Sequence, residues 1–352
     1  MILYVVRYHP ALSETFVRDE LRGLHRAGVA VELAAFDARD AVDVEPVEAP
    51  VHGQPHRWGW LGALPTLVVE WLRRPARVSP RILWLAALAR RATRVHIHFA
   101  GEAAEWARAA CARSGVPYSV TVHAVDLYKP RPALTAVLQD AAAVVAMTAF
   151  NQALVAERHG VVARLVRFGL ALDTIPRADP ARSRRVIAVG RNVPKKGLDL
   201  VAALAPRLGD TAEIVLVSDA LPAPGVTVLG LRPHAEVLRE LAAAAVFVLP
   251  CRRAPDGDMD GLPVALVEAM AAGLPVITTT VSGLPELVDD EVGWLVPPDE
   301  LGALEAAVRM AMADPEARAR KGAAGRERVR ARGYDLSRLV AEMREVLGVG
   351  RG

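Results

Sequence analysis

The chain has 352 residues, which exceeds one ordinary domain and fits two domains of about 100 to 200 residues each. Hydrophobic residues make up 52% of the chain and charged residues 24%, so most of it can bury a core and extended disorder is excluded. Lys and Arg number 43 against 40 Asp and Glu, a balance too even for a dedicated nucleic-acid-binding protein.

Two further features bear on the compartment. The two cysteines, Cys111 and Cys251, are too few for a disulfide framework or a cysteine-built zinc site, and they indicate a reducing compartment. No segment supplies the roughly 18 consecutive apolar residues of a membrane-spanning helix. The N-terminal apolar run meets Arg7 too early for a signal peptide. We therefore expect a cytoplasmic protein.

Short aliphatic and β-branched runs alternate with longer amphipathic segments, which is typical of parallel βαβ units. The strands predicted in the first half are ILYVV, VAVELAAF, VHIHF, YSVTVH and AVVAM. Those predicted in the second half are RVIAVG, AEIVLVS, VTVLG, VFVLP, PVITT and GWLVP. Predicted helices include FVRDELRGLHRAG and HAEVLRELAAAA, the latter with its apolar residues on one face. Each half therefore reads as an α/β domain with a Rossmann-type sheet.

A domain boundary is expected near residues 173–185, which are rich in Pro and charge and lack apolar periodicity. The predicted domains are residues 1–172 and 173–335. Residues 336–352 are predicted to hold an amphipathic C-terminal helix, which could fold back on either domain and is expected on the N-terminal one.

A basic segment lies within the first predicted domain. Residues 57–94 contain eight Arg and one Glu, a net charge of +7, interleaved with Trp and Leu. This composition suits peripheral contact with an anionic membrane, and it suits equally well the solvated basic face of a core helix. Both interpretations stay open at this point.

Three histidines follow or lie within predicted strands of the first half. His96 and His98 alternate along one strand and share a sheet face, a spacing compatible with a metal ion. No third ligand is evident nearby, so we interpret them as pocket-lining or structural residues and predict no metal site. His123 follows a strand in SVTVHAVDLY, and a lone His in such a place is more often structural than ligand-binding.

The motif GRNVPKKGLDL, residues 190–200, directly follows a predicted strand. Gly190 lets the backbone turn tightly, and Arg191, Lys195 and Lys196 then place cations over a βα loop at the carboxyl edge of a sheet. Open α/β sheets bind their ligands at this edge, and clustered guanidinium and ammonium groups suit a diphosphate. The alternative is a solvated basic loop.

An acidic loop and a helix follow in residues 256–279, DGDMDGLPVALVEAMAAGLPVITT. If the helix begins near Pro263, its backbone N–H groups and positive dipole end face whatever Gly261 allows to approach. Asp260 would lie in the loop and Glu268 in the helix, so the two carboxylates could hold different hydroxyl groups of one ligand. Alternatively, Asp260 caps the helix and Glu268 is solvated.

Two kinds of metal site could be read into this loop. The segment from Asp256 to Gly261 resembles the start of an EF-hand loop, but Val267 occupies the twelfth position and Glu268 comes one residue late, which excludes calcium. Asp258 and Asp260 also form an Asp-x-Asp pair of the kind that can hold a divalent cation on a nucleotide diphosphate. Such pairs are common by chance, and we predict no metal here.

Taken together, these motifs resemble glycosyltransferase family 4. Its members are retaining enzymes that use nucleotide sugars, and their GT-B fold has two Rossmann-like domains facing across a central cleft. The likeness is strongest over residues 186–334, where the two motifs above and the strands between them follow one another in the family's order. In the first half, HPALSETFVRDELRGLHRAG looks like the opening of exopolysaccharide-type transferases, and SVTVHAVDLY looks like the family's His-containing sugar loop.

The resemblance implies roles for particular residues. The implied catalytic residues are His123, which would contact the donor sugar, Arg191 and Lys196, which would neutralise the diphosphate, and Asp260, which replaces a Glu that usually contacts the transferred sugar. Asp126 would help to hold the His123 loop. The donor-binding residues that the resemblance implies are Arg191, Lys196, Gly261, Leu262, Val264 and Glu268, the last holding the ribose hydroxyls.

The sequence also departs from the family pattern. Asp260 is one methylene shorter than the usual Glu, which leaves the choice of donor sugar open. VLVSDALPAPG replaces a Gly-Asp-Gly stretch, and Cys251 stands where a Ser is frequent. The first loop lacks the usual glycine pair, although Ser13 and Glu14 could still contact an acceptor or the diphosphate.

The resemblance implies transfer of a hexosyl group, with retention and without a metal or cofactor, from a nucleotide diphosphate sugar to a hydroxyl acceptor. A cell-surface polysaccharide, a lipid-linked glycan and a specialised metabolite are the acceptors considered. Fixed cations and a helix N-terminus would stabilise charge on the departing diphosphate. The alternative is a non-catalytic nucleotide-sugar-binding or scaffold protein of a glycan pathway. No nucleic-acid partner is expected, because aromatic residues make up only 5% of the chain.

Overall fold

The computed structural model describes residues 1–9, 15–37, 48–53, 79–129 and 131–350, and the chain divides into two compact units. The first unit comprises Met1–Met147, Gln152–Phe168 and Leu336–Gly352, and the second comprises Thr148–Asn151 and Gly169–Asp335. The chain thus passes into the second unit after Phe168 rather than after residue 172. The reason is local, since Leu170 forms a bridge with Asp335 and its N–H donates to the Tyr334 carbonyl at 3.0 Å.

The first unit is built on a seven-stranded parallel sheet with the strand order β3-β2-β1-β4-β5-β6-β7. Its strands are β1 (Ile2–Tyr8), β2 (Val31–Asp37), β3 (Val51–Gly53), β4 (Arg94–His98), β5 (Tyr118–Val122), β6 (Ala143–Ala146) and β7 (Arg164–Leu165). The five predicted strands are confirmed. The sequence did not predict β3 and β7, because these edge strands have only three and two residues and no buried apolar run.

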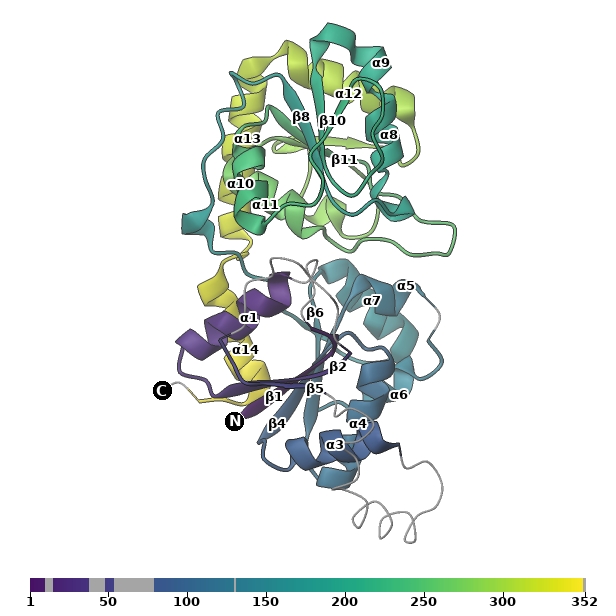
Figure 1. The fold of residues 1–352 in the computed structure, drawn as a ribbon, viewed down its shortest axis with the longest axis vertical. Helices are drawn as coiled ribbons and strands as arrows, with labels where there is room; N and C mark the ends of the chain where they lie inside the picture. The colour runs from purple at the N-terminus through teal and green to yellow at the C-terminus, as the bar shows by residue number, and fades with distance from the viewer. Residues whose placement is uncertain (10–14, 38–47, 54–78, 130, 351–352) are drawn as a thin grey trace. The chain divides into compact units, whose positions relative to one another are not determined.

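Helices cover this sheet, and the C-terminal segment supplies one of them (Figure 1). They are α1 (Thr15–Arg26), α3 (Pro80–Ala89), α4 (Glu102–Ser114), α5 (Ala124–Tyr128), α6 (Leu134–Gln139), α7 (Ala149–His159) and α14 (Leu336–Leu347). The helix α1 buries Val17, Leu21 and Leu24 at the three- and four-residue spacing of one helix face. In Figure 1 α14 lies beside α1, and the buried Leu339 and Met343 of α14 share one hydrophobic cluster with that face.

The second unit repeats this architecture with a six-stranded parallel sheet in the order β10-β9-β8-β11-β12-β13. Its strands are β8 (Arg185–Val189), β9 (Glu213–Val217), β10 (Val226–Val228), β11 (Val246–Leu249), β12 (Val276–Thr279) and β13 (Gly293–Val296), which confirms all six predicted strands. The helices are α8 (Leu198–Ala203), α9 (Ala205–Leu208), α10 (His234–Ala242), α11 (Val264–Ala272), α12 (Leu301–Ala313) and α13 (Pro315–Ala331).

Both sheets are doubly wound, and this fixes where a ligand can bind. The first strand of each unit, β1 or β8, lies inside its sheet, and the connections run outward from it in both directions. The strand order therefore reverses between β1 and β4 and again between β8 and β11. Ligands of open α/β sheets bind beyond the carboxyl ends of the strands at such a reversal. The residues of β11 are fully buried, as expected for a parallel strand covered on both faces.

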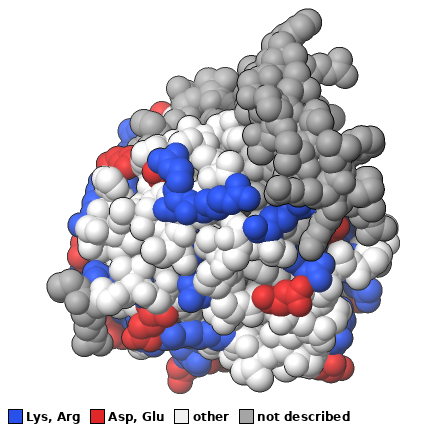
Figure 2. Space-filling view, turned by 90° about the horizontal axis from the view of Figure 1, so that it is seen from below, with Lys and Arg blue, Asp and Glu red and all other residues white. Residues whose placement is uncertain are grey.

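The described part of the chain contains no helix long and apolar enough to cross a membrane. Of the basic segment 57–94, residues 57–78 lie outside the described residues. In the described part, Trp84 of α3 contacts Phe36 edge-on, with ring centroids 5.4 Å apart, and the Arg81 guanidinium lies 4.4 Å from the centre of the Trp106 ring. On the face shown in Figure 2, basic side chains lie among uncharged and acidic ones.

Candidate functional site

The loop after β8 is shaped by one glycine. Pro194–Lys196 form a single 3₁₀ turn, and Gly197 ends it with φ +65°, in the left-handed region. A Cβ atom at Gly197 would lie 2.3 Å from the carbonyl oxygen of Pro250, which follows β11. Only glycine satisfies both conditions. The loop can therefore approach the end of β11, which places Lys195 and Lys196 at the reversal of strand order.

These two lysines form ion pairs with the acidic loop that precedes α11. The Lys196 Nζ lies 2.8 Å from Asp260 Oδ2, and the Lys195 Nζ lies 3.2 Å from Asp260 Oδ1 and 3.2 Å from Asp258 Oδ2. All four side chains are between 13% and 16% exposed, so water screens the pairs only weakly. The structure thus joins the two predicted motifs in one cluster.

Burial and charge act in opposite directions in this cluster. Burial alone would lower the pKa of the Lys196 ammonium, but the Asp260 carboxylate outweighs it and raises that pKa. Burial alone would raise the pKa of Asp260, but the charges of Lys196 and Lys195 lower it. Both residues are therefore charged at neutral pH. A divalent cation at Asp258 and Asp260 would be repelled by the two ammonium groups.

Asp260 does not cap the helix. The N-cap of α11 is Pro263, and Asp260 is directed to the lysines, so the capping interpretation is wrong. The Cys251 thiol is fully buried and lies 3.9 Å from Asp260 Oδ2. Burial raises the pKa of this thiol, which therefore stays protonated and donates weakly to the carboxylate.

Glu268 is buried rather than solvated, so that alternative is also wrong. Its side chain is 5% exposed on α11, and its Oε1 lies 2.7 Å from the Nε2 of His234, the first residue of α10. Sequence reasoning missed His234. The partners are 34 positions apart in the chain, so no local pattern links them.

The remaining predicted donor-binding residues surround this cluster within the second unit. Arg191 is exposed at the start of the basic loop, and its positive charge acts to lower the pKa of Lys196. Gly261 is buried and Leu262 half-buried in the turn before α11, and Val264 is the first helical residue. The first N–H groups of α11 therefore lie next to the ion-paired loop, although Pro263 itself has none to offer.

The first unit contains a second polar cluster, buried under α1. The Tyr4 hydroxyl donates to Glu20 Oε1 at 2.7 Å, and the His98 Nε2 lies 3.4 Å from the same oxygen. The other ring nitrogen of His98, Nδ1, lies 3.2 Å from the Nε2 of His123. Each of these side chains is at most about 6% exposed. The carboxyl ends of β4 and β5 thus bring His98 and His123 together.

Glu20 was missed in the sequence, although a signal was present. It stands on the inward face of α1, among Val17, Leu21 and Leu24, where a charged residue requires a partner. Glu20, His96 and His98 bring potential ligand atoms within 4.8 Å of one another, so a third metal-ligand candidate does exist beside the two histidines.

Both ring nitrogens of His96 have polar partners on β5, the neighbouring strand of the same sheet. Its Nδ1 lies 2.8 Å from the Ser119 hydroxyl and its Nε2 lies 3.1 Å from the Thr121 hydroxyl. Its Nε2 is 4.0 Å from Glu20 Oε1. Burial lowers the pKa of His96 to about 3, and the nearby His98 acts in the same direction, so His96 is neutral at pH 7. These contacts agree with a structural role for His96.

His123 ends β5 and precedes α5. The Asp126 carboxylate accepts hydrogen bonds from the N–H groups of His123 and Ala100, both at 2.9 Å, and so holds this loop as expected. Burial raises the pKa of Asp126 to about 6. The Phe99 ring stacks on the His123 ring with centroids 3.9 Å apart, and Phe99 has a left-handed φ of +69°, which is strained for such a bulky residue.

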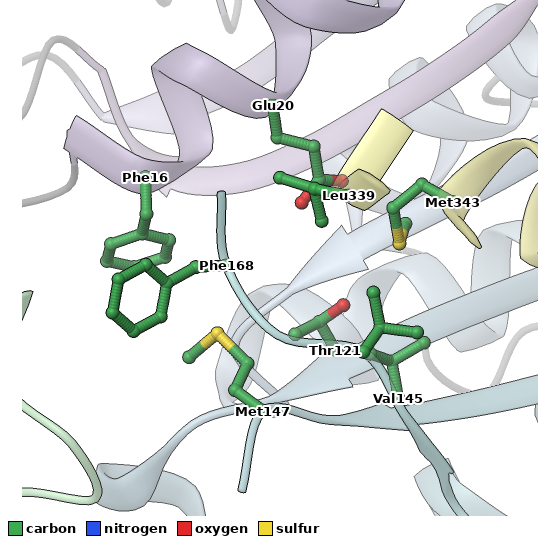
Figure 3. Close-up of a pocket in the computed structure, with 9 residues that line it drawn as sticks. Phe16, Glu20, Thr121, Val145, Met147, Phe168, Leu339 and Met343 are labelled. Atoms are coloured by element: carbon green, nitrogen blue, oxygen red, sulfur yellow. The ribbon is translucent and has the colours of Figure 1, made fainter. Parts of the chain in front are cut away.

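A small cavity of about 10 Å³ lies beside this network, which is room for about one water molecule. Figure 3 shows that its lining is mostly apolar, with Phe16, Met147, Phe168 and Met343 among the lining residues, and that Glu20 and Thr121 supply the oxygen atoms. It is too small for a sugar or a nucleotide, so it is not the candidate substrate site.

Two doubly wound units, each with charged or titratable groups at the reversal of strand order, define an α/β protein with a candidate ligand site at the carboxyl edge of each sheet. The family model for glycosyltransferase family 4 matches residues 13–174, and the model for group 1 glycosyl transferases matches residues 183–314. The two models together account for most of the chain. The chain belongs to glycosyltransferase family 4, and its two Rossmann-like units are those of the GT-B fold.

Curated relatives align with parts of the chain. The amylovoran biosynthesis glycosyltransferase AmsK of Erwinia amylovora is 47% identical over 93 residues, which is 26% of this chain and 23% of that protein. A GDP-mannose-dependent phosphatidylinositol monomannoside mannosyltransferase of Mycolicibacterium smegmatis is 31% identical over 252 residues, 61% of this chain and 66% of that protein. The alignments thus span less than two thirds of these relatives' lengths.

Solved structures share the fold over the whole chain. Anabaena HepE, crystallised with UDP and glucose, has a TM-score of 0.79 at 18% identity and covers 99% of each chain. Sucrose-phosphate synthase of Thermosynechococcus elongatus has a TM-score of 0.72 at 20% identity, covering 98% of this chain and 97% of that one. At such low identity the likeness concerns the fold alone.

Proposed function

We propose that this protein transfers a hexosyl group from a nucleotide diphosphate sugar to a hydroxyl acceptor, with retention and without a metal ion. The observation that carries the proposal is the pair of charged lysines, Lys195 and Lys196, held at the carboxyl end of β8 beside the N-terminus of α11. Fixed cations and free helix N–H groups at one place are what a diphosphate requires. Family membership is the second support.

In the proposed chemistry, the ion-paired cluster of Lys195, Lys196, Asp258 and Asp260 has one role without ligand and another when the donor is bound. In the protein without ligand, Asp258 and Asp260 neutralise the two lysines. A donor diphosphate competes for the same ammonium groups, and Lys196 and Arg191 then stabilise the charge that builds on the leaving diphosphate. We assign Asp260 to the transferred sugar once it is released from the lysines, and Glu268 to the ribose hydroxyls. His234 beside Glu268 fixes that carboxylate's orientation.

The acceptor belongs, in this proposal, to a cell-surface polysaccharide or a lipid-linked glycan. The relatives named above act in amylovoran biosynthesis and on a phosphatidylinositol monomannoside. A lipid-linked acceptor agrees with peripheral membrane contact through residues 57–94, from the cytoplasmic side, because that segment carries a net +7. A hydroxyl group of a specialised metabolite is the other acceptor class that is compatible with the same donor site.

The first experiment is calorimetry of the full chain with GDP, UDP, ADP and dTDP, followed by GDP-mannose and UDP-glucose, each with and without EDTA. We expect one nucleotide to bind with EDTA-insensitive affinity, and its sugar conjugate to be consumed when an acceptor extract is added. Binding of a nucleotide sugar without hydrolysis or transfer would instead favour the scaffold alternative. Binding that requires a divalent ion would contradict the metal-independent mechanism.

A further inference from the structure

The Glu20 carboxylate is buried beneath α1 and faces two histidines of β4. It is 5% exposed, and the Tyr4 hydroxyl donates to its Oε1 at 2.7 Å. A buried carboxylate is costly unless a cation or a full set of hydrogen bonds compensates its charge. Among the described residues, the basic groups within 4.0 Å of Glu20 Oε1 are the Nε2 atoms of His96 and His98. A cation bound by all three side chains would compensate the charge.

The His98 Nε2 atom is buried and has no hydrogen-bond partner among the described residues. It lies 3.4 Å from Glu20 Oε1, beyond the roughly 2.7–2.9 Å of a charge-assisted N–H···O hydrogen bond. Two ligands of a tetrahedral zinc ion, each about 2.0–2.1 Å from the metal, are about 3.3 Å apart. The observed separation therefore fits two ligands of one metal ion better than a hydrogen-bonded pair.

His96 supplies a third ligand atom. Its Nε2 lies 4.0 Å from Glu20 Oε1, and ligand atoms of Glu20, His96 and His98 all lie within 4.8 Å of one another. Shifts of about 1 Å would bring them to the spacing of zinc ligands. The His96 Nε2 also lies 3.1 Å from the hydroxyl of Thr121, which lines the small cavity beside Glu20 (Figure 3). That hydroxyl can turn towards the cavity, so a metal ion can replace its contact with His96.

The same cavity limits the number of further ligands. Its volume of about 10 Å³ has room for about one water molecule. Three side chains and one water make a four-coordinate site, which Zn²⁺ prefers, and imidazole and carboxylate groups are ordinary zinc ligands. Two histidines and a carboxylate also bind Fe²⁺, but such sites keep several open positions, for which this cavity is too small. The site therefore suits Zn²⁺.

The second ring nitrogen of each histidine also has a polar neighbour. His96 Nδ1 lies 2.8 Å from the Ser119 hydroxyl, and His98 Nδ1 lies 3.2 Å from His123 Nε2. Zinc-bound histidines usually donate from this second nitrogen, which orients the ring and leaves the other lone pair to the metal. His123 then carries its proton on Nδ1, so its side chain loses the Asp126 N–H that the capping box of α5 gives it. That N–H keeps its 3.0 Å bond to the His123 carbonyl.

We propose that Glu20, His96 and His98 form a structural zinc site, which fixes α1 to β4 in the first unit. The inference goes beyond the proposed function and does not rest on it. All three ligands belong to the first unit, whereas the lysine cluster proposed for the donor diphosphate lies in the second. Nucleotide binding should therefore be insensitive to EDTA whether or not the zinc site is filled.

The test is metal analysis of the full chain, produced without an affinity tag in medium that contains Zn²⁺. Inductively coupled plasma mass spectrometry should find about one zinc ion per chain, as for a built structural site. X-ray absorption should show nitrogen and oxygen ligands at about 2.0–2.1 Å and no sulfur at about 2.3 Å. Sulfur ligands would place the ion at a cysteine and contradict the proposal.

Three variants locate the ion. His98→Gln removes a ligand and should weaken zinc binding by more than about 100-fold, because loss of an outer contact alone costs about 10- to 100-fold. Ser119→Ala removes such an outer contact from His96 and should weaken binding by about 10-fold. His52→Gln is the matched control. It breaks another His–Glu pair of the first unit, in which His52 Nε2 lies 2.8 Å from Glu32 Oε2, and should keep the zinc affinity of wild type.

The structural role is measured on α1 itself. Amide hydrogen exchange in peptides that cover α1 should be slower in the zinc-loaded chain than in the chain stripped by a chelator. The Tm should rise with the concentration of free Zn²⁺, because the metal binds the folded state. In His98→Gln neither the exchange rate nor the Tm should respond to zinc.

Two results would overturn the proposal. One is a wild-type chain that holds no zinc after incubation with Zn²⁺, and the other is zinc binding by His98→Gln as tight as that of wild type. If His98→Gln does not fold, the zinc content and X-ray absorption of the wild-type chain decide. None of these measurements needs a sugar donor, so absence of sugar transfer by a zinc-loaded chain would count against the proposed function alone.

Discussion

The Lys196 side chain is the most direct test of the proposed diphosphate site. Lys196→Ala removes an ammonium group that is buried and already charged, so we expect turnover with the cognate donor to fall by about 10²- to 10³-fold. The folded state should survive, because Asp260 keeps its contact with Lys195 at 3.2 Å. Steady-state kinetics and calorimetry with the nucleotide that binds wild type would measure both effects.

A matched control is available on α13. Lys321→Ala also removes one lysine charge from the second unit, but its Nζ lies 4.9 Å from the centre of the Trp294 ring and outside the ion-paired cluster. Donor binding should therefore stay within a factor of about two of wild type, as for a charge change away from the site. Equal losses in both variants would show that net charge, rather than the local site, governs binding.

Gly197 allows a prediction about stability at the residue scale. In Gly197→Ala the methyl group would meet the Pro250 carbonyl oxygen, and the alanine would also have to adopt φ +65°. Together these effects should lower the free energy of unfolding by about 2–4 kcal/mol and weaken nucleotide binding, because the lysine turn must shift. Urea unfolding followed by fluorescence is the measurement.

Gly230→Ala is the control for Gly197→Ala, because it isolates the free-energy cost of a positive φ from the cost of a clash. Gly230 has φ +75°, and a Cβ atom there would have no described atom within 4 Å, so Gly230→Ala introduces conformational strain without a clash. Its cost should be about 1–2 kcal/mol, with nucleotide binding unaffected. If the two variants lost the same stability, close approach to Pro250 would not be the reason for glycine at position 197.

At the scale of elements, α14 completes the core of the first unit from the other end of the chain. Met343 is 1% exposed in the cluster that joins α14 to α1, and it also lines the small cavity of Figure 3. Met343→Ala should enlarge that cavity and cost about 2–5 kcal/mol. Met310→Ala on α12, where the side chain is 59% exposed, should change the free energy of unfolding by less than about 0.5 kcal/mol.

At the scale of the whole molecule, local sequence patterns predict the strands and the loops that follow them. They do not predict contacts between residues that are far apart in the chain. Parallel strands read as apolar or β-branched runs, so every strand from β1 to β13 except β3 and β7 was predictable, and a basic loop after a strand indicated the edge of a sheet. The pairs Glu20–His98 and His234–Glu268 were not predictable. No periodic pattern in the sequence indicates which side chains of separate helices and strands come into contact through tertiary packing.

The free energy of unfolding should depend on pH differently in the two units. In the first unit burial lowers the pKa of His96 to about 3 and the pKa of His123 well below its ordinary value. For such groups stability is complete above the unfolded pKa of about 6.5 and is lost as pH falls towards the folded pKa. Asp126 acts oppositely. Its pKa is raised to about 6, so its protonation increases the stability of the folded unit as pH falls from 6 towards 4.

His9 and His159 also have lowered pKa values, so four imidazoles of the first unit oppose the single Asp126 carboxyl, and the unit should lose stability as pH falls from 6 to 4. Among the described residues of the second unit, Asp260 has a lowered pKa, so its contribution is lost only as pH falls below about 4. The first unit should therefore unfold at lower urea concentration at pH 5 than at pH 7.5, with the second unit little changed.

Pulse-labelling hydrogen exchange after urea equilibration, read by mass spectrometry for peptides of each unit, measures this difference. His96→Gln retains polar contacts for Ser119 and Thr121 and removes one titrating group. Because His9, His123 and His159 keep their lowered pKa values, the pH dependence of the first unit should become shallower between pH 6 and pH 4 without vanishing. Equal acid sensitivity of both units, or an unchanged slope in His96→Gln, would mean that the buried imidazoles are not the source of the effect.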